Sequence, residues 1–381
     1  MHPLMGGNFS TLLRALRRQG GVPLKTVPHM LAFLGAAAVR LPATLLERAM
    51  MGEVPVGPDY DSEPVFVVGH WRSGTTHLHN LLGCSSRFGI ITPLASGLPL
   101  ELLTLASWFR PFLEKGLPED RGVDQVAVTP QSPQEDEIPM ANMQMLSVFH
   151  AVYFPASFQR NFDEGVFFEG VTEEEVAEWE RRILYFYRKV SRHQDGKRLL
   201  IKNPVYTARM SRLLKLWPKA KFIHIHRNPF VVYSSTVHYY RKLLPELALQ
   251  SFDHLDVEEM VLTNYPKLMD TLDQDRRQLR DDQFAEIAFE DLENDPLAVL
   301  KGIHERLGIS GWQDAEVSTQ RYLASLKSYQ KNRFSLEEED ELRAMTGRPR
   351  ARSRGAELCA REQLGATAAH AILIDGGERE R

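Results

Sequence analysis

The 381-residue chain has little cysteine, no long apolar run and no strong net charge. Its two cysteines, Cys84 and Cys359, lie far apart and follow no metal-ligand spacing, so we expect neither a disulfide framework nor a zinc site. This cysteine usage predicts a cytoplasmic protein. The most apolar run, residues 30–39, is shorter than the ~20 residues that span a bilayer, and it lies too deep in the chain for a signal peptide. The net charge of −4 argues against a nucleic acid as the main partner.

Positive charge is concentrated in the first fifty residues, where six basic residues accompany a single acidic one. Apolar residues, mainly leucines, lie between the basic ones. Breaks at Gly20, Gly21 and Pro28 predict two or three short amphipathic helices. We expect this helical arm, residues 1–58, to pack on the main domain, as most amphipathic helices do. The alternative is that the first fifty residues contact a membrane surface peripherally, or cap an apolar substrate site.

Short apolar segments alternate with longer amphipathic ones in the rest of the chain. They predict strands at residues 65–68, 199–201, 222–225 and 286–289, and helices at residues 173–193, 207–217 and 296–307. This alternation is typical of right-handed βαβ units, so residues 59–345 are expected to form an α/β domain with a central parallel sheet and helices on both faces. Residues 346–381 contain a basic, turn-rich run and are expected to be a disordered tail.

The first predicted strand runs into a loop bounded by glycines, and a helix follows the loop. Such a strand–loop–helix aims backbone N–H groups and the positive end of the helix at one point, which suits a phosphate. Gly69 and Gly74 have the spacing of a Walker motif, but Thr75 and Thr76 stand where that motif has its lysine and hydroxyl residue. The loop instead carries its own cation, Arg72.

An Mg²⁺-dependent nucleotide triphosphate site also needs an acidic residue, usually at the end of an apolar strand. The comparable strand here, residues 222–225, is followed by His226 and Arg227. The pattern therefore predicts an anion held by cations and hydroxyl groups, without a metal ion.

A second anion-binding element begins at this strand end. Asn228 suits a helix N-cap and Pro229 suits the first helical position. Arg227 then lies at the carboxyl end of the strand, where ligands bind in open α/β sheets. Ser235 follows Asn228 by two helical turns and so lies on the same face. An arginine and a hydroxyl group that converge there favour a second phosphate.

The two elements together resemble those of the sulfotransferase family that uses 3′-phosphoadenosine 5′-phosphosulfate (PAPS), and residues 132–139 and 200–209 resemble its bacterial branch. The resemblance covers residues 64–334 and implies a P-loop-like, sulfotransferase-type fold. It implies that the 5′-phosphosulfate is held by Arg72, Ser73, Gly74, Thr75 and Thr76, with Arg72 also neutralising charge on the bridging oxygen. It further implies that Arg227 and Ser235 bind the 3′-phosphate.

Lys202 is predicted to supply a cation to the transferred group, because it ends the strand at residues 199–201 on the same sheet edge. The alternative is a solvated lysine at a strand end. In the cytosolic animal members of the family that the chain resembles, a similarly placed lysine is followed two residues later by a catalytic histidine. That position is Pro204 here, so the base has to come from elsewhere.

The acidic run at residues 135–137 is the first candidate for the base. Ser132 is expected to cap a helix that begins at Pro133, with the three acids in its first turn. We favour Glu135, then Glu137; the alternative is that the acids only stabilise the helix dipole. Rival bases are the histidines, with His70 first because it lies in the loop: His70, His77, His79, His150, His224 and His226.

Two further segments follow from the resemblance. Residues 289–292 resemble a late segment that packs near the adenine, and residues 327–334 are expected to bring Lys331 or Arg333 to the 3′-phosphate. The resulting prediction is in-line transfer of a sulfonate group from PAPS to a hydroxyl or amine of a small or lipid-like acceptor. The alternatives are a P-loop kinase and an inactive nucleotide-binding relative.

Overall fold

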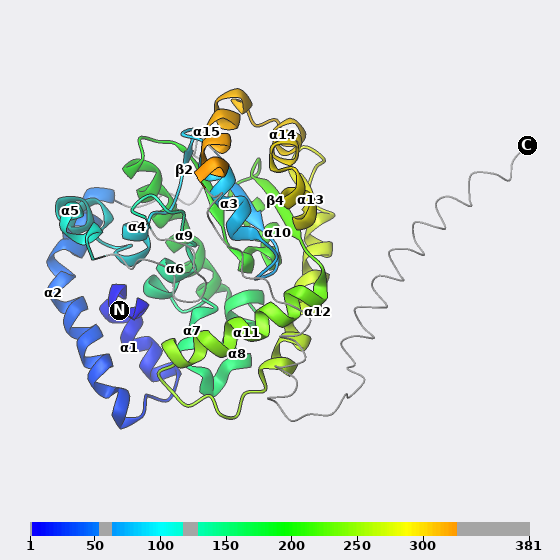
Figure 1. Cartoon of the computed structure of the whole chain (residues 1–381). Coiled ribbons are helices and arrows are strands. Elements are labelled where there is room, and N and C mark those ends of the chain that lie inside the picture. Colours follow the sequence, from blue (N-terminus) through cyan, green and yellow to red (C-terminus); the bar gives the residue numbers. More distant parts are fainter. Residues whose placement is uncertain (1, 53–62, 117–128, 326–381) are drawn as a thin grey trace, which may run out of the picture.

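The computed structural model describes residues 2–52, 63–116 and 129–325 of the chain (Figure 1). At its centre is a parallel five-stranded sheet with the strand order β2-β3-β1-β4-β5. The strands are β1 (Val65–Val68), β2 (Phe88–Gly89), β3 (Arg198–Lys202), β4 (Lys221–His226) and β5 (Phe284–Ala288). Because all five are parallel, their carboxyl ends meet at one edge of the sheet.

Helices cover both faces of this sheet. In β1, Phe66 and Val68 pack into the core on one face, and Val65 and Val67 into the core on the other, so all four are buried. The first face is covered by α9 (Glu173–His193), α10 (Met210–Leu216) and α12 (Val257–Arg276). The second is covered by α3 (Thr75–Gly83), α13 (Phe289–Asn294), α14 (Pro296–Leu307) and α15 (Trp312–Ser325). The predicted three-layer α/β/α fold is therefore confirmed.

The predicted elements agree with the observed ones except near turns. Helices α9 and α14 have the predicted bounds. The helix expected at residues 207–217 is a 3-10 turn, η5 (Pro204–Ala208), followed by α10, because the Asn203 side chain accepts a hydrogen bond from the N–H of Val205 and starts the turn early. Strand β5, expected at residues 286–289, lies at Phe284–Ala288. It ends one residue early because Phe289 already begins α13. Strand β2 was not predicted, because two residues carry no periodic signal.

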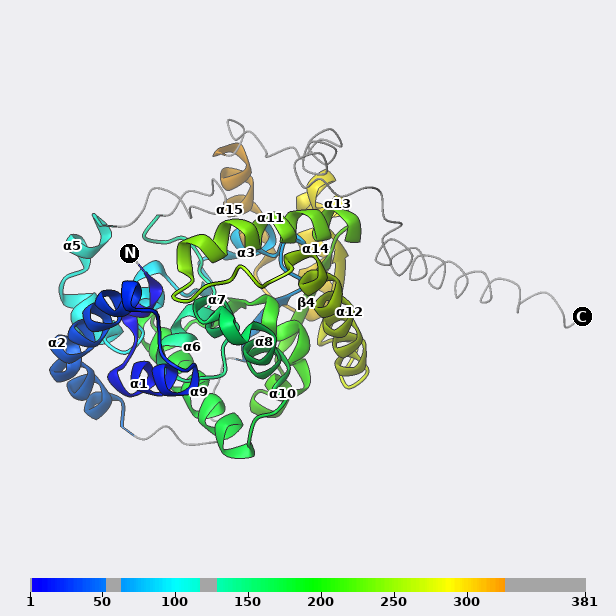
Figure 2. The same ribbon diagram turned by 90° about the horizontal axis from the view of Figure 1, so that it is seen from below.

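The remaining helices connect these layers and pack around them. They are η1 (Pro3–Gly6), α1 (Phe9–Arg18), η2 (Leu24–Thr26), α2 (Val27–Met51), α4 (Pro93–Gly97), η3 (Leu102–Ala106), α5 (Arg110–Glu114), α6 (Glu137–Met143), α7 (Phe149–Tyr153), η4 (Pro155–Ser157), α8 (Phe158–Phe167) and α11 (Pro229–Leu247). Figure 2 shows α11 crossing above α7 and α8 in a view from below.

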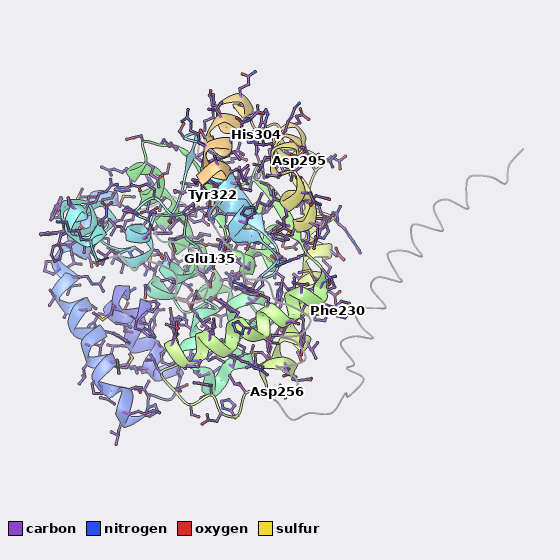
Figure 3. All side chains as sticks on the ribbon, viewed as in Figure 1. Glu135, Phe230, Asp256, Asp295, His304 and Tyr322 are labelled. Carbon is purple, nitrogen blue, oxygen red and sulfur yellow. The ribbon has the colours of Figure 1, made fainter. Side chains whose placement is uncertain are left out.

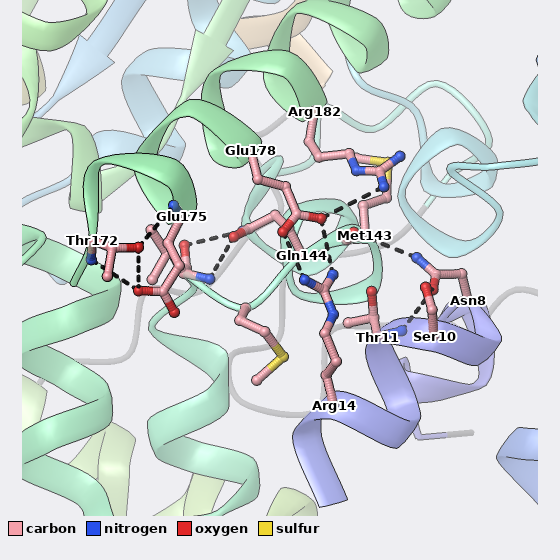
Figure 4. A network of polar contacts seen from close by, with 12 residues as sticks. Asn8, Ser10, Thr11, Arg14, Met143, Gln144, Thr172, Glu175, Glu178 and Arg182 are labelled. Atoms are coloured by element: carbon pink, nitrogen blue, oxygen red, sulfur yellow. Dashed lines mark hydrogen bonds and ion pairs between the residues drawn. The ribbon is translucent and has the colours of Figure 1, made fainter. Parts of the chain in front are cut away.

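The N-terminal helices pack on the rest of the chain. Arg14 of α1 donates two hydrogen bonds to Glu178 of α9, at 2.7 and 2.9 Å, and Asn8 donates to the carbonyls of Asn142 and Met143 (Figure 4). The predicted break at Gly20 and Gly21 is present. The predicted break at Pro28 is wrong, because Pro28 lies in the first turn of α2, where proline replaces an N–H that has no helical partner.

Helix α2 also corrects the expectation of no long apolar run. In the described part of the chain, the stretch Leu24–Met51 is long and apolar enough to cross a membrane by length and composition, with a mean hydropathy of 1.5 in its most apolar window. The apolar run continues past Arg40, so the helix is much longer than residues 30–39. Only 17% of that window is buried.

Candidate active site

The loop between β1 and α3 has a backbone that only particular residues allow. Gly69 has φ 139° and Gly74 has φ 97°. A Cβ atom on Gly69 would lie 2.3 Å from the carbonyl oxygen of Ile225, and one on Gly74 would lie 2.2 Å from Cδ2 of Phe289. Arg72 adopts a left-handed conformation with φ 69°, which costs about 1–3 kcal/mol and tends to occur at functional sites. The loop is thus shaped by β4 and by the first residue of α13.

Hydrogen bonds fix the loop in this shape. The Ser73 side chain donates to the carbonyl of His70 (2.8 Å), and the Gly69 N–H donates to Thr207 Oγ1 (2.8 Å). Helix α3 begins at Thr75, and Gly74 offers it no capping side chain. The N–H groups of its first turn therefore face the loop, as required for binding an anionic group.

The two predicted anion elements lie next to each other. Arg72 donates a hydrogen bond from Nε to Ser235 Oγ on α11, at 3.0 Å. The guanidinium of Arg227 lies 4.3 Å from the ring centroid of Phe289, the residue that packs on Gly74. Burial lowers the pKa of Arg227, and the positive charge of Arg72 lowers it further against the opposing effect of nearby glutamates. The structure thus brings Arg72, Arg227 and Ser235 to one sheet edge.

A second group forms where β3 ends. Lys202 is buried, with an exposed fraction of 2%. Its ammonium group forms an ion pair with Glu135 and donates to Thr76 Oγ1 at 3.3 Å. The alternative of a solvated lysine is therefore wrong. The cation of Lys202, the carboxylate of Glu135 and the hydroxyl of Thr76 come from three separate segments and meet at the first turn of α3. Figure 3 labels Glu135 near the centre of the molecule, in the region of α6.

The local structure around the acidic run differs from the prediction. Helix α6 begins at Glu137 and has Asp136 as its N-cap residue, so Ser132 and Pro133 do not start a helix. The reason is that the N–H of Gln134 donates to the carbonyl of Ile91 (2.8 Å), which holds this segment against the chain that follows β2. Glu135 is therefore in a loop, with a side chain 22% exposed.

Glu137 is held inside the protein. Its exposed fraction is 1%, and its carboxylate accepts hydrogen bonds from Asn203 Nδ2 (2.7 Å) and the N–H of Val148 (2.9 Å). Burial raises its pKa. Because both oxygens are occupied by protein donors, we assign Glu137 to positioning and leave Glu135 as the candidate base.

Asp136 joins a buried network that the sequence analysis missed. It accepts hydrogen bonds from the hydroxyl of Tyr187 (2.7 Å), the hydroxyl of Tyr206 and Nδ2 of Asn203 (2.9 Å). Asn203 directly follows Lys202, so the network connects the segment of Glu135 to the end of β3. The only available signal was the polar pair Lys202–Asn203 at a strand end, because the tyrosines lie on other elements.

The buried Asp136 carboxyl is expected to make stability fall as the pH rises. Burial raises its pKa from 3.8 to about 6. Between these values the folded chain binds more protons than the unfolded chain, so the free energy of unfolding decreases with increasing pH, by ~2–3 kcal/mol in total. Asp136→Asn removes this titration. Urea unfolding at about pH 4 and about pH 6 should show a smaller pH dependence in the variant, and an unchanged dependence would contradict the assignment.

His70, the first rival base, is also buried. Its Nδ1 lies 2.8 Å from the carbonyl of Trp71, and burial lowers its pKa to about 4. A base with so low a pKa is poorly matched to an acceptor at neutral pH.

The other histidines have structural surroundings or lie at the surface. His79 and His150 are buried against backbone carbonyls, and burial lowers the pKa of His150 to about 4. His224 is bound to Glu286 at 2.9 Å. The ring of His77 lies 6.5 Å from that of Phe289, and His226 is exposed.

Two predictions lie outside the described residues. They are the assignment of Lys331 or Arg333 to the 3′-phosphate and the nature of the tail at residues 346–381.

Comparisons with known proteins show the family to which the chain belongs. The model of the sulfotransferase family matches residues 64–314, which include every described site residue. The chain is 31% identical over 335 residues to omega-hydroxy-beta-dihydromenaquinone-9 sulfotransferase Stf3 of Mycobacterium bovis and of Mycobacterium tuberculosis, covering 87% of this chain and 85% of theirs.

Two solved structures share the fold. Sulfotransferase STF1 of Mycobacterium tuberculosis has a TM-score of 0.57 at 17% identity, covering 82% of this chain and 85% of that chain. Sulfotransferase STF9 of Mycobacterium avium has a TM-score of 0.56 at 17% identity, covering 87% of this chain and 90% of that chain. With a family model that matches more than half of its length, the chain belongs to the sulfotransferase family and is a sulfotransferase.

Proposed function

We propose that the sulfonate donor is PAPS, held by two anion sites on one sheet edge. The loop at residues 69–74 and the first turn of α3 suit the 5′-phosphosulfate, and Arg227 and Ser235 suit the 3′-phosphate. The contact between Arg72 and Ser235 carries this proposal, because it joins the two elements within 3.0 Å. A nucleotide with phosphates at both ends of its ribose matches two adjoining cationic sites better than a triphosphate does.

In the proposed reaction, Glu135 takes the proton of the acceptor hydroxyl as the oxygen attacks the sulfur in line. Lys202 touches both Glu135 and Thr76, so it lies between the base and the phosphosulfate loop. There it stabilises the charge on the transferred group, while Arg72 neutralises the leaving phosphate oxygen. The S–O bond to the phosphate breaks, and adenosine 3′,5′-bisphosphate leaves.

The acceptor is proposed to be the hydroxyl of a lipid-like molecule. The mycobacterial relative is named for a hydroxylated dihydromenaquinone, and it matches most of both chains. Apolar side chains are exposed on α2 and around α5. Helix α5 belongs to the segment of the chain between β2 and Glu135. We also propose a cytoplasmic location, in keeping with the free thiol of Cys84.

A thermal-shift comparison tests the donor directly. Adenosine 3′,5′-bisphosphate should raise the melting temperature without added metal, because binding to the folded state alone stabilises it. ATP with Mg²⁺ should raise it less. If ATP with Mg²⁺ gives the larger shift, the kinase alternative is favoured and the donor assignment is wrong.

A further inference from the structure

Two charged residues of helix α2, Arg40 and Glu47, lie against the protein. Arg40 donates hydrogen bonds to Glu101 (2.8 Å) and to the carbonyl of Gly7 (2.9 Å). Glu47 and Lys189 form an ion pair in which both side chains are fully buried. These contacts fix the helix along the surface of the domain, and withdrawing it would leave buried charges without their partners.

The outward face of α2 is apolar over most of its length. Its side chains are 45–83% exposed, and they are Leu31, Val39, Leu41, Leu45, Leu46 and Met50. A helix face in contact with water is usually polar, and an exposed apolar face of this length marks an interaction surface.

Aromatic side chains extend this surface. Trp108, Phe109 and Phe112 are 55–76% exposed. They follow η3, which is joined to α2 because the N–H groups of Leu103 and Thr104 each donate to Glu47 at 2.9 Å. Figures 1 and 2 both show α2 and α5 at the same outer edge of the molecule. Exposed aromatic residues beside an apolar helix are typical of the membrane interface.

The charge around this surface is positive. Lys25 just before α2 and Arg48 near its end are exposed, whereas the acid of this helix, Glu47, is buried. Basic residues beside an apolar helix face are attracted to anionic lipid headgroups.

We propose that the outward face of α2, together with the aromatic residues Trp108, Phe109 and Phe112, docks the enzyme on an anionic lipid bilayer, with α2 lying in the interface plane. The purpose of docking rests on the proposed function, because it would bring a lipid-like acceptor from the bilayer to Glu135. The expectation of membrane contact through residues 1–50 is thereby narrowed to α2, and the α5 region is added to it.

Vesicle flotation tests the docking surface. The full chain should float with phosphatidylcholine vesicles that contain phosphatidylglycerol, and Val39→Asp/Leu46→Asp should reduce the bound fraction at least about tenfold. Val317→Asp is the matched control, because Val317 is 47% exposed on α15. It should bind as the wild type does. All three proteins should have the same melting temperature, since the changed side chains are exposed.

Tryptophan fluorescence gives an independent measure. Of the five tryptophans, Trp108 is the exposed one, at 61%. Vesicles should shift its emission to shorter wavelength, and Trp108→Phe should abolish most of the shift. A wild-type chain that neither floats nor shifts would overturn the proposal. A second result would also overturn it. If the wild-type chain does not bind vesicles but forms a dimer that Val39→Asp/Leu46→Asp disrupts, then α2 contacts a second copy of the chain.

Activity assays separate this proposal from the proposed function. Val39→Asp/Leu46→Asp should transfer sulfonate normally to an acceptor in detergent micelles and poorly to one embedded in vesicles. Equal loss in both assays would contradict docking. A wild-type chain that binds vesicles but transfers nothing from PAPS would instead contradict the donor assignment and leave the docking result standing.

Discussion

Replacing Glu135 by glutamine is expected to lower kcat by about 10²–10⁴-fold, the usual contribution of a general base. The amide keeps the size of the side chain but cannot take the acceptor proton. Affinity for adenosine 3′,5′-bisphosphate should stay within about twofold, because Arg72, Arg227 and Ser235 are unchanged. Steady-state kinetics with PAPS and calorimetry with the bisphosphate give the two values.

Glu180→Gln is the matched control for this variant. Glu180 has a side chain 20% exposed and forms an ion pair with Arg212 at 3.2 Å, on α9 and α10, so it resembles Glu135 in exposure and pairing. Its replacement should leave kcat unchanged. A kcat of Glu135→Gln within about threefold of the wild-type value would show that another group is the base.

Arg227→Ala is expected to lower the affinity for adenosine 3′,5′-bisphosphate by about 10–100-fold, as expected when hydrogen bonds to a charged group are lost. The affinity for adenosine 5′-phosphate should fall by about twofold or less, because this ligand lacks the phosphate that Arg227 is proposed to bind. Calorimetric titration of both ligands gives the comparison.

Arg276→Ala controls for the loss of packing in this experiment. Arg276 lies 4.8 Å from the ring centroid of Phe284, as Arg227 lies over Phe289, but it forms an ion pair with Glu286, which is on β5 with Phe284. Replacement of Arg276 should leave the affinity for both ligands unchanged. An equal loss of both ligands in Arg227→Ala would refute the assignment of this arginine to the 3′-phosphate.

The local structure of the two proposed anion-binding elements was predictable because each element is continuous in the sequence. An apolar strand, two glycines, Arg72 and the helix beginning at Thr75 follow one another, so short-range geometry alone aims their donors at one point. The same holds for Arg227, which directly follows β4, and for Asn228, which caps α11 through the N–H of Phe230.

The group around Lys202 and Glu135 could not be predicted in the same way, because its contacts join distant segments. Lys202 and Glu135 are 67 positions apart, and the roles of the three neighbouring acids depend on their burial. Glu135 forms an ion pair with Lys202 at the sheet edge, whereas the carboxylates of Asp136 and Glu137 accept hydrogen bonds from buried side chains. Pro28 failed as a predictor for a similar reason, since proline both ends helices and begins them.

Transfer of radiolabelled sulfonate from PAPS to a hydroxylated isoprenoid quinol, in detergent and with a metal chelator present, tests the central claim most directly. We predict that label appears in the quinol in a one-to-one ratio with adenosine 3′,5′-bisphosphate, and that Glu135→Gln nearly abolishes it. Absence of label in the quinol, together with phosphate transfer from ATP in the presence of Mg²⁺, would contradict the proposed function.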